Sequence, residues 1–316
     1  MTGVERRAAA TSLSTVADPA LAGGAAWIEG ELVPVEEARI PILDTGFVRS
    51  DLTYDVVSVW RGSFFRLDDH LARFQRNWTR VRLSPPFGRD EIRALLIDMV
   101  RRSGLRDAYV AMILTRGVPA PGERDPRSFR NRFYAYAVPF VWIQRPDQQA
   151  AGTHLVIARD TIRIPPTAVD PTVKNFHWGD LVRGLYEAYD RGGALGALTD
   201  GNGNVTEGPG FNVFALVDGV LRTPADGVFD GMTRRTLIEL VQEEGAAPLQ
   251  LGPLPVAELA RASEVFLSST AGGVMPVTTL DGATVGDGRP GELTRRLQAR
   301  YWLAHEDPRF ATPVTR

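Results

Sequence analysis

A single lysine, Lys174, occurs in this chain of 316 residues. Lysine and arginine together number 36, so the other 35 are arginine. Arginine stays protonated near neutral pH, whereas a desolvated lysine amine can lose its proton and attack a carbonyl carbon to form a Schiff base. The neighbours Val173, Phe176 and Trp178 are apolar, and apolar surroundings favour a neutral amine. Lys174 is therefore the leading candidate for a covalent nucleophile; the alternative is a surface charge left by chance in an arginine-rich composition.

A lysine of this kind needs a carbonyl partner, which is either an aldehyde substrate or pyridoxal phosphate. The cofactor would also need a phosphate site and an acid facing its ring nitrogen. Thr233 opens an expected helix after the turn DGM, and Thr270 begins a Thr-Ala-Gly-Gly turn; both settings present free N–H groups to anions. Glu207 lies on a short expected strand between glycine turns. Each residue also has an ordinary interpretation, as a helix cap, a tight turn or a solvated edge residue.

Several other chemistries are excluded by residue type and spacing. The chain has no cysteine, so disulfides, thiolate catalysis and cysteine-ligated zinc or iron–sulfur sites are excluded. Its four histidines are far apart, and we expect no metal site. Gly201, Gly203 and Gly208 miss the G-x-G-x-x-G spacing of a dinucleotide site. Neither a Walker-type GK[ST] motif nor a G-x-S-x-G elbow occurs.

The composition is that of an ordinary globular protein, with 44% hydrophobic and 23% charged residues. A formal net charge of −2 and a pI near 6.1 favour neither nucleic acid nor an anionic membrane as a partner. The N-terminus superficially suggests a signal peptide, but its apolar stretch is short and interrupted, so we expect an extended arm over residues 1–24. No apolar run reaches the roughly eighteen residues that span a bilayer, and the expected location is cytoplasmic.

Hydrophobic periodicity predicts a chain of mixed helices and strands. One helix follows Asp69, with Leu71, Phe74, Trp78 and Val81 on one face. Further helices are expected at 91–103, after 174, at 233–244 and at 290–305. Strands are expected at 53–60, 108–114, 133–142, 155–159, 197–199, 212–217, 220–222 and 265–269. Hairpins mixed with helices, without regular βαβ alternation, favour an α+β fold.

We expect two mixed α/β domains with a linker between them. Residues 25–143 would form a smaller N-terminal α+β domain, and residues 153–316 a larger C-terminal domain. Residues 144–152 (QRPDQQAAG) lack periodicity and are the expected linker. The long polar loop over 116–130 is uncommon in a compact domain unless it serves a site.

Five motifs, in order along the chain, carry a resemblance to a known family: SDLTYDVVSVWRGSFFRLDDHLARF, VDPTVKNFHWGD, TEGPGFNV, DGMTRRT and SSTAGGVMPVTTLDG. With these motifs the chain resembles the fold type IV pyridoxal phosphate enzymes, which include branched-chain and D-amino acid transaminases. It is most similar to the (R)-selective amine transaminases, over nearly the whole chain. The resemblance implies pyridoxal 5'-phosphate (PLP) as the cofactor. Its site would lie between the two domains, and the larger C-terminal domain would be the one that binds it. It also implies a homodimer with active sites near the interface.

The resemblance further implies a role for each motif residue. Lys174 would form the internal aldimine with the cofactor and carry the proton during transamination. Glu207 would pair with the ring nitrogen, and Phe229 would pack against the ring, where a leucine is more usual. The phosphate would be bound by Arg73, by the backbone of Met232 and Thr233, and by Thr270. The substrate pockets would be lined by Tyr54, Val56, Tyr109, Trp178 and Ala271.

Two departures from the family pattern bear on the substrate. Arg49 precedes SDLTYD, where many (R)-amine transaminases carry histidine, and this position should face the site across the dimer interface. The loop TRGVPAPGERDPRS is also altered. The family uses a mobile arginine there to hold a keto acid carboxylate; Arg124 is the best match, with Arg116 as the alternative. An additional guanidinium would favour substrates that carry a carboxylate.

The expected reaction is a ping-pong transamination from an (R)-configured primary amine or a D-amino acid to a keto acid such as pyruvate. The alternatives within PLP chemistry are a D-amino acid transaminase, a branched-chain-type aminotransferase without amine activity, and a carbon–carbon lyase of the aminodeoxychorismate type. Outside catalysis, the chain could be a PLP-binding carrier or regulator, or a structural or interaction protein that binds no cofactor.

Overall fold

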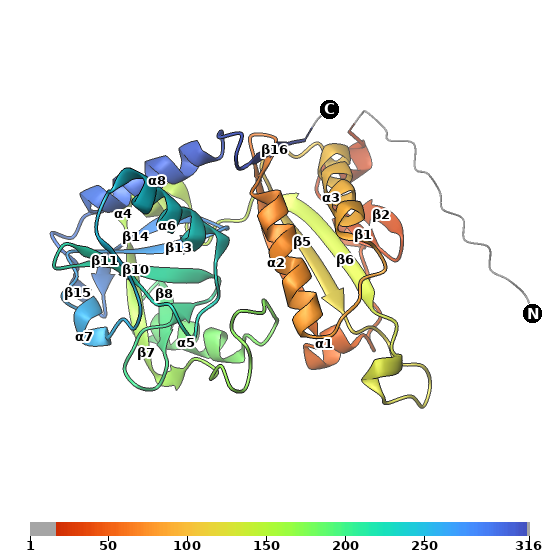
Figure 1. Cartoon of the computed structure of the whole chain (residues 1–316), viewed down its shortest axis with the longest axis horizontal. Coiled ribbons are helices and arrows are strands. Elements are labelled where there is room, and N and C mark those ends of the chain that lie inside the picture. The colour runs from red at the N-terminus through yellow and green to blue at the C-terminus, as the bar shows by residue number, and fades with distance from the viewer. Residues whose placement is uncertain (1–16, 315–316) are drawn as a thin grey trace, which may run out of the picture.

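Two β-sheets divide the structure into two halves that lie side by side in Figure 1. The computed structural model describes residues 17–314, and within them the sheets have seven and nine strands. One sheet is built by the N-terminal half together with the last strand of the chain, and the other by the C-terminal half. Antiparallel strand pairs mixed with helices agree with the predicted α+β fold class.

The N-terminal sheet is antiparallel throughout, in the order β16-β4-β3-β5-β6-β1-β2. Its strands are β1 (Ala25–Ile28), β2 (Glu31–Pro34), β3 (Leu52–Trp60), β4 (Ser63–Phe65), β5 (Ala108–Thr115), β6 (Arg132–Pro139) and β16 (Ala311–Pro313). Side chains alternate along β3, so Val57 and Val59 enter the core beneath the helices. Tyr54 and Val56 lie on the opposite face, which is the face that contributes to the cavity described below.

Helix α2 (Leu67–Arg80) covers the N-terminal sheet together with α3 (Arg89–Ser103). Its apolar stripe of Leu71, Phe74 and Trp78 is buried, as the periodicity predicts. Arg66, immediately before the helix, pairs through Nη1 with Oε2 of Glu239 at 2.6 Å. Because Glu239 belongs to α6 (Met232–Glu244), this ion pair ties α2 to the C-terminal half.

The C-terminal sheet has the order β12-β11-β10-β13-β14-β7-β8, and β9 and β15 pair with β10 and β14. Its strands are β7 (Thr153–Ile162), β8 (Leu195–Thr199), β9 (Glu207–Gly208), β10 (Phe211–Val217), β11 (Val220–Thr223), β12 (Leu249–Leu251), β13 (Glu264–Ser269), β14 (Gly273–Leu280) and β15 (Ala283–Thr284). The pair β7–β8 is parallel, so the chain must cross over between them, and α5 (Gly179–Asp190) does so. Lys174 lies in this crossover, before α5 begins.

Helices α6 and α8 (Glu292–Ala304) pack on one face of the C-terminal sheet, against Phe214, Phe266 and Val274. Helix α5 packs on β7 and β8, where Leu181 meets Ala158. Strand alternation places Ala158 on the same face as Phe214 and Val274, so α5, α6 and α8 all lie on one face of the sheet, and Leu155, Val213 and Met275 form a separate core on the other face. The helices do not cover the ends of β9, β10 and β13 that border the cavity described below. The N-terminus of α6 lies beside these strand ends.

The structure differs from the expected domain scheme in three places. Residues 144–152 do join the two halves, but they contain helix α4 (Pro146–Ala151) instead of an irregular linker. Residues 311–313 return to pair with β4 in the N-terminal sheet, so the region 153–316 does not form one separate unit. Of the expected arm over 1–24, residues 1–16 lie outside the described part, and Pro19–Leu21 forms a 3-10 turn packed on α3. Elements this short have too little periodicity to be seen in a sequence.

The remaining helical segments are also short. They are α1 (Thr45–Arg49), α7 (Val256–Leu259), and the 3-10 turns at Val35–Glu37 and Pro126–Ser128. None of the helices between residues 17 and 314 combines the length and the apolar character needed to cross a bilayer. In the same residues no cluster of three or more His, Asp or Glu side chains is placed to hold a metal ion.

Candidate active site

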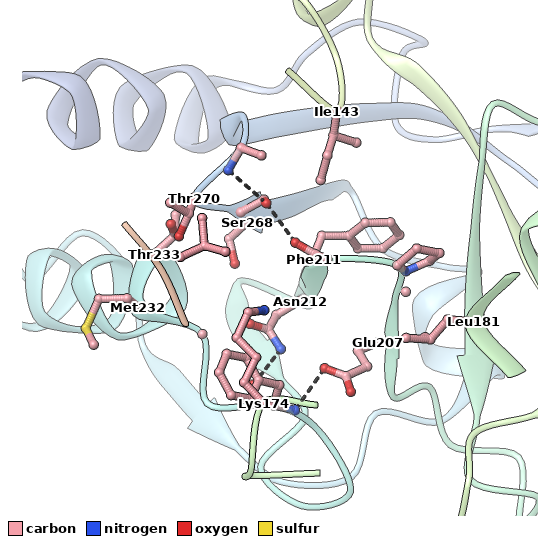
Figure 2. Close-up of a pocket in the computed structure, with 18 of the residues that line it drawn as sticks. Ile143, Lys174, Leu181, Glu207, Phe211, Asn212, Met232, Thr233, Ser268 and Thr270 are labelled. Carbon is pink, nitrogen blue, oxygen red and sulfur yellow. Dashed lines mark hydrogen bonds between the residues drawn. The ribbon is translucent and has the colours of Figure 1, made fainter. Parts of the chain in front are cut away.

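A cavity of about 270 Å³ is lined by residues of both halves (Figure 2). The N-terminal half contributes Tyr54 and Val56 from β3, Tyr109 from β5 and Arg73 from α2. The C-terminal half contributes the segment around Lys174, the β9–β10 hairpin, the N-terminus of α6 and the β13–β14 turn. Segments far apart in the sequence therefore meet at one site.

Lys174 reaches this cavity from the crossover between β7 and α5. Its carbonyl oxygen accepts hydrogen bonds from the Tyr54 N–H at 3.1 Å and from the Thr53 hydroxyl at 2.8 Å, so the segment is bound to β3. Its Nζ lies 4.6 Å from the centroid of the Tyr54 ring and 4.7 Å from that of the Phe229 ring. The amine thus faces aromatic rings inside the cavity, which is not the setting of a fully solvated surface charge.

Glu207, on β9, is buried at the wall of the cavity and points into it (Figure 2). Its Oε1 accepts from Nε of Arg163 at 3.0 Å, and its Oε2 accepts from the N–H of Phe229 at 2.8 Å. Burial raises the pKa of Glu207, although the Arg163 guanidinium opposes the rise. Arg163 also pairs with Asp180 at 2.7 Å, so it is shared between two carboxylates. Glu207 is therefore a fixed, desolvated carboxylate, unlike a solvated edge residue.

Arg73 projects from α2 and is held by an acidic partner on β3. Its Nε and Nη2 donate to the two carboxylate oxygens of Asp55 at 2.8 and 2.7 Å, and its Nη1 donates to the carbonyl oxygen of Asp230 at 2.8 Å. Asp55 also bonds Nδ1 of His70 at 2.9 Å. Burial alone would raise the pKa of Asp55, but Arg73 and His70 together hold it well below its usual range. Burial lowers the pKa of His70, so this imidazole is neutral near pH 7.

The N-terminus of α6 and the β13–β14 turn lie on the same side of the cavity in Figure 2. Gly231 is the N-cap of α6, so Met232 and Thr233 are its first two residues and Thr233 is not the cap that the sequence predicts. The first N–H groups of a helix have no partner within the helix and attract anions. The Thr233 hydroxyl lies 3.1 Å from that of Tyr301, and Thr270 lies in the turn opposite. This side of the cavity therefore suits an anion.

The rest of the cavity wall is apolar and aromatic. All five residues predicted to line the substrate pockets do line the cavity: Tyr54, Val56, Tyr109, Trp178 and Ala271. The structure adds apolar residues that the sequence did not single out for the site, among them Val141, Ile143, Leu181 and Phe211. Burial raises the pKa of Tyr109 far above neutrality, so its phenol is uncharged.

Two predicted site residues do not line the cavity of this chain. Arg49 is exposed at the end of α1 and borders a separate hollow together with Asp51 and His177. Arg124 is exposed on the loop over 116–130. The alternative, Arg116, pairs with Asp51 at 3.0 Å. The arginines expected to hold a substrate carboxylate are therefore outside the cavity.

Three buried polar residues of the site were missed by the sequence analysis. Arg163 is one of 35 arginines and nothing in the local sequence marks it. Asp55 sits inside a strand pattern, where a buried acid is unexpected. Asn212 is the second residue of β10, and its Nδ2 donates to the Phe229 carbonyl oxygen at 2.8 Å. Only their partners, all distant in sequence, reveal these residues.

The groups assembled here fit PLP. Lys174 supplies an amine for an aldehyde, Glu207 a buried carboxylate for a ring nitrogen, and Phe229 an aromatic face. A phosphate finds the N-terminus of α6, the β13–β14 turn and the guanidinium of Arg73. None of these features is specific for PLP when it occurs alone. The occurrence of all of them around one cavity is specific for PLP.

Comparison with known proteins points to one family. The sequence model of the family described as amino-transferase class IV matches residues 52–280, which is more than half of the chain. A putative branched-chain-amino-acid aminotransferase of Methanocaldococcus jannaschii is 29% identical over 278 residues, covering 87% of this chain and 94% of the relative. A D-alanine aminotransferase of Bacillus licheniformis is 28% identical over 271 residues, covering 85% and 93%.

Solved structures agree with the sequence matches. A T.th. branched-chain amino acid aminotransferase, solved with pyridoxamine 5'-phosphate, superimposes with a TM-score of 0.85 at 25% identity. The match covers 92% of this chain and 99% of that one. A match of this extent includes parts of both sheets, so the two structures share their overall architecture.

Proposed function

This chain belongs to the class IV amino-transferase family, and from that premise we propose that it moves an amino group from an (R)-configured primary amine or a D-amino acid to a keto acid such as pyruvate. Family membership and the similar structures confirm three predictions: fold type IV, PLP as the cofactor, and aminotransferase as the reaction class. The preference for an (R)-amine is the finer part of the proposal and rests on the cavity and on the motif resemblance.

The residues divide the chemical work between them. When bound, PLP supplies the aldehyde that takes up the amino group and the ring that accepts the electron pair freed at the substrate carbon. The Nζ of Lys174 would take the proton from the substrate carbon and pass it to the cofactor carbon that receives the amino group, and the second half of the transfer would run the same proton movement in reverse. Glu207 holds a proton at the ring nitrogen, because its buried negative charge stabilises a cation beside it. Arg73, Thr270 and the backbone of Met232 and Thr233 hold the phosphate.

The observation that carries the substrate proposal is the apolar wall beside the Lys174 amine. Among the described residues that line the cavity, neither arginine is left for a substrate carboxylate: Arg163 is paired with Glu207 and Asp180, and Arg73 is paired with Asp55 and would use its remaining N–H groups on the cofactor phosphate. An amine with an aromatic or aliphatic substituent can bury that substituent against the wall without leaving a charge unpaired. A substrate carboxylate needs a cation from elsewhere, and we assign that role to Arg124 or Arg49.

A homodimer is the second part of the proposal, and it would bring Arg49 of one subunit toward the site of the other. The surface beside Arg49 supports it, because Ile42, Leu43 and Phe47 there are 68%, 61% and 61% exposed. A cluster of exposed apolar side chains is typical of an association surface. Sedimentation of the wild-type protein and of Phe47→Ser tests this: we expect a dimer that the substitution weakens, and a wild-type monomer at micromolar concentration would contradict it.

The half-reaction with single donors tests the substrate proposal. Protein loaded with PLP is mixed with (R)-1-phenylethylamine, its (S)-enantiomer, D-alanine or L-leucine, and the loss of the cofactor's visible absorbance is followed. We expect (R)-1-phenylethylamine, with or without a similar reaction of D-alanine, to react at least about tenfold faster than the (S)-amine and L-leucine, since a shaped pocket discriminates by this much or more. Pyruvate should then restore the absorbance.

The other outcomes identify the alternatives. A reaction with D-alanine alone indicates a D-amino acid transaminase, and a reaction with L-leucine alone a branched-chain-type enzyme. Pyruvate formed from a substrate without amino transfer indicates a lyase. An absorbance that no donor changes indicates a carrier or regulator. Each of these would overturn the (R)-amine proposal.

A further inference from the structure

The turn Phe229–Gly231, which leads into α6, is held by three side chains from three different elements. Glu207 of β9 accepts from the Phe229 N–H at 2.8 Å, and Asn212 of β10 donates to the Phe229 carbonyl oxygen at 2.8 Å. Arg73 of α2 donates to the Asp230 carbonyl oxygen, also at 2.8 Å. Successive backbone groups of one turn are thus bound by residues from both halves of the molecule. The turn connects the carboxylate side of the cavity to its anion side.

Gly231 has no conformational reason to be glycine. Its φ of −62° and ψ of 138° lie in the region that every residue adopts. A Cβ added there would lie 2.2 Å from the Oδ1 of Asn212, while the next nearest atom, the Cγ of the same asparagine, would be 3.4 Å away. The Asn212 side chain is therefore the only close obstacle among the described atoms around this position. Asn212 and Gly231 fit each other as a pair.

Asn212 is also linked directly to the carboxylate side of the cavity. It is directly opposite Glu207 in the β9–β10 ladder, and β10 is central in its sheet, next to β13. The side chain is buried and points into the cavity near Lys174 (Figure 2). A residue on a central strand moves little, so the amide is a rigid brace and not an adaptable surface group.

We propose that Asn212 is a positioning residue, which sets the separation between the Glu207 carboxylate and the N-terminus of α6. The inference rests on PLP as the cofactor of the proposed function and deepens that function. A ligand that reaches both Glu207 and α6 gains full affinity only when their separation matches its own length. Gly231 is needed because any larger residue would displace the Asn212 side chain.

A double-mutant cycle at positions 212 and 231 tests the proposal without using catalysis. The probes are 4-deoxypyridoxine 5'-phosphate and 4-deoxypyridoxine, which lack the aldehyde and so cannot bond to Lys174. Their dissociation constants are measured by titration calorimetry for the wild type, Asn212→Ala, Gly231→Ala and the double variant. Asn204→Ala is the matched control, because its amide also braces a turn, at Asp200, away from the cavity lining.

Each single substitution should weaken the binding of the phosphorylated probe by about tenfold. This is the usual effect of losing one buried hydrogen bond or of displacing the side chain that makes it. The double variant should be no weaker than Asn212→Ala, because removing the asparagine frees the space that the added methyl group needs. The unphosphorylated probe reaches only one side and can shift in the cavity, so its affinity should change by less than about threefold. Asn204→Ala should behave as the wild type.

Three results would overturn the proposal. They are an additive loss of about a hundredfold in the double variant, an unchanged affinity in either single variant, and equal losses for the two probes. Equal losses with a lowered melting temperature would mark Asn212 as merely structural. If Asn212→Ala does not fold, Asn212→Ser replaces it, since serine cannot reach the Phe229 carbonyl. A wild type that binds neither probe would instead contradict the proposed function itself.

Discussion

The carboxylate and anion side of the cavity and the substrate side are built in opposite ways. On the first side, Glu207, Arg73 and Asn212 are buried, and their polar contacts join other elements or the Phe229–Gly231 turn. On the second side the wall is apolar, and the arginines expected to act there, Arg49 and Arg124, are exposed. One side is a rigid network, and the other is an apolar wall with its charges outside the cavity.

This difference separates chemistry from specificity. A reaction step common to many substrates benefits from groups held in one geometry before the substrate arrives. Discrimination between donors needs only a shape and one well-placed charge, which a loop can supply or withhold. We therefore expect substitutions in the network to abolish or slow every reaction, and substitutions on the substrate side to change the preferred substrate.

The largest effect is expected at Lys174. Lys174→Ala should lower transamination by about ten-thousandfold or more and remove the visible absorbance of the bound cofactor, because no other amine lines the cavity in the described residues. Lys174→Arg is the control: it keeps a positive charge, so an equally inactive variant shows that the amine and not the charge matters. Activity retained in Lys174→Ala would end the assignment.

The next effect is expected at Glu207. Glu207→Gln should retain the cofactor but lower kcat by about a hundredfold, since a neutral amide does not stabilise a protonated ring nitrogen. Asp180→Asn is the matched control, because it also removes a carboxylate partner of Arg163 but stands outside the cavity lining. Equal losses of kcat in the two variants would indicate that the effect comes from Arg163 instead.

An acid-dependent loss of stability should occur away from both sides of the cavity. His305, buried against Phe65, has a pKa lowered to about 4 by burial, against 6.5 when unfolded. The unfolded chain therefore binds the extra proton between pH 6.5 and 4, and the free energy of unfolding should fall by up to about 3 kcal/mol over that range. Denaturation of the wild type and of His305→Gln at pH 7 and about pH 4.5 measures this fall in the free energy of unfolding. An equal fall in the two proteins would contradict the prediction.

A smaller effect is expected at Asp55, the partner of Arg73. Asp55→Asn should weaken the binding of PLP by about tenfold, because the Arg73 guanidinium loses its charged bidentate partner and its fixed orientation. Equilibrium dialysis with PLP measures the loss. Pyridoxal, which lacks the phosphate, is the control and should change less; equal losses for the two ligands would indicate general damage to the site.

The smallest effect is expected on the substrate side. Arg124→Ala should raise the KM for pyruvate by about fivefold and leave the half-reaction with (R)-1-phenylethylamine unchanged, since only the keto acid carries a carboxylate. Arg127→Ala, in the same loop and paired with Asp125, is the control. An unchanged KM for pyruvate in Arg124→Ala would move the carboxylate role to Arg49.

Most long elements were predicted, whereas several short ones were missed. The buried stripe of α2 and the strand β3 stand where periodicity predicts them, because each repeats its pattern over several turns or alternations. Helix α4 and strand β16 were missed, since six and three residues leave no repeat to detect. Strand β14 was missed although it has eight residues, because it is buried on both faces and does not alternate.

The amino-acid sequence alone was enough to predict which group does the chemistry. One amine among guanidinium groups, with motifs in a fixed order, predicted Lys174 and Glu207 as site residues and PLP as the cofactor. Only the tertiary structure decided which polar residues hold them, as with Arg163 and Asn212, and where Arg49 and Arg124 stand. The physical reason is that a reactive side chain is recognised by its own type, whereas a brace is defined by a partner that folding brings within hydrogen-bond distance.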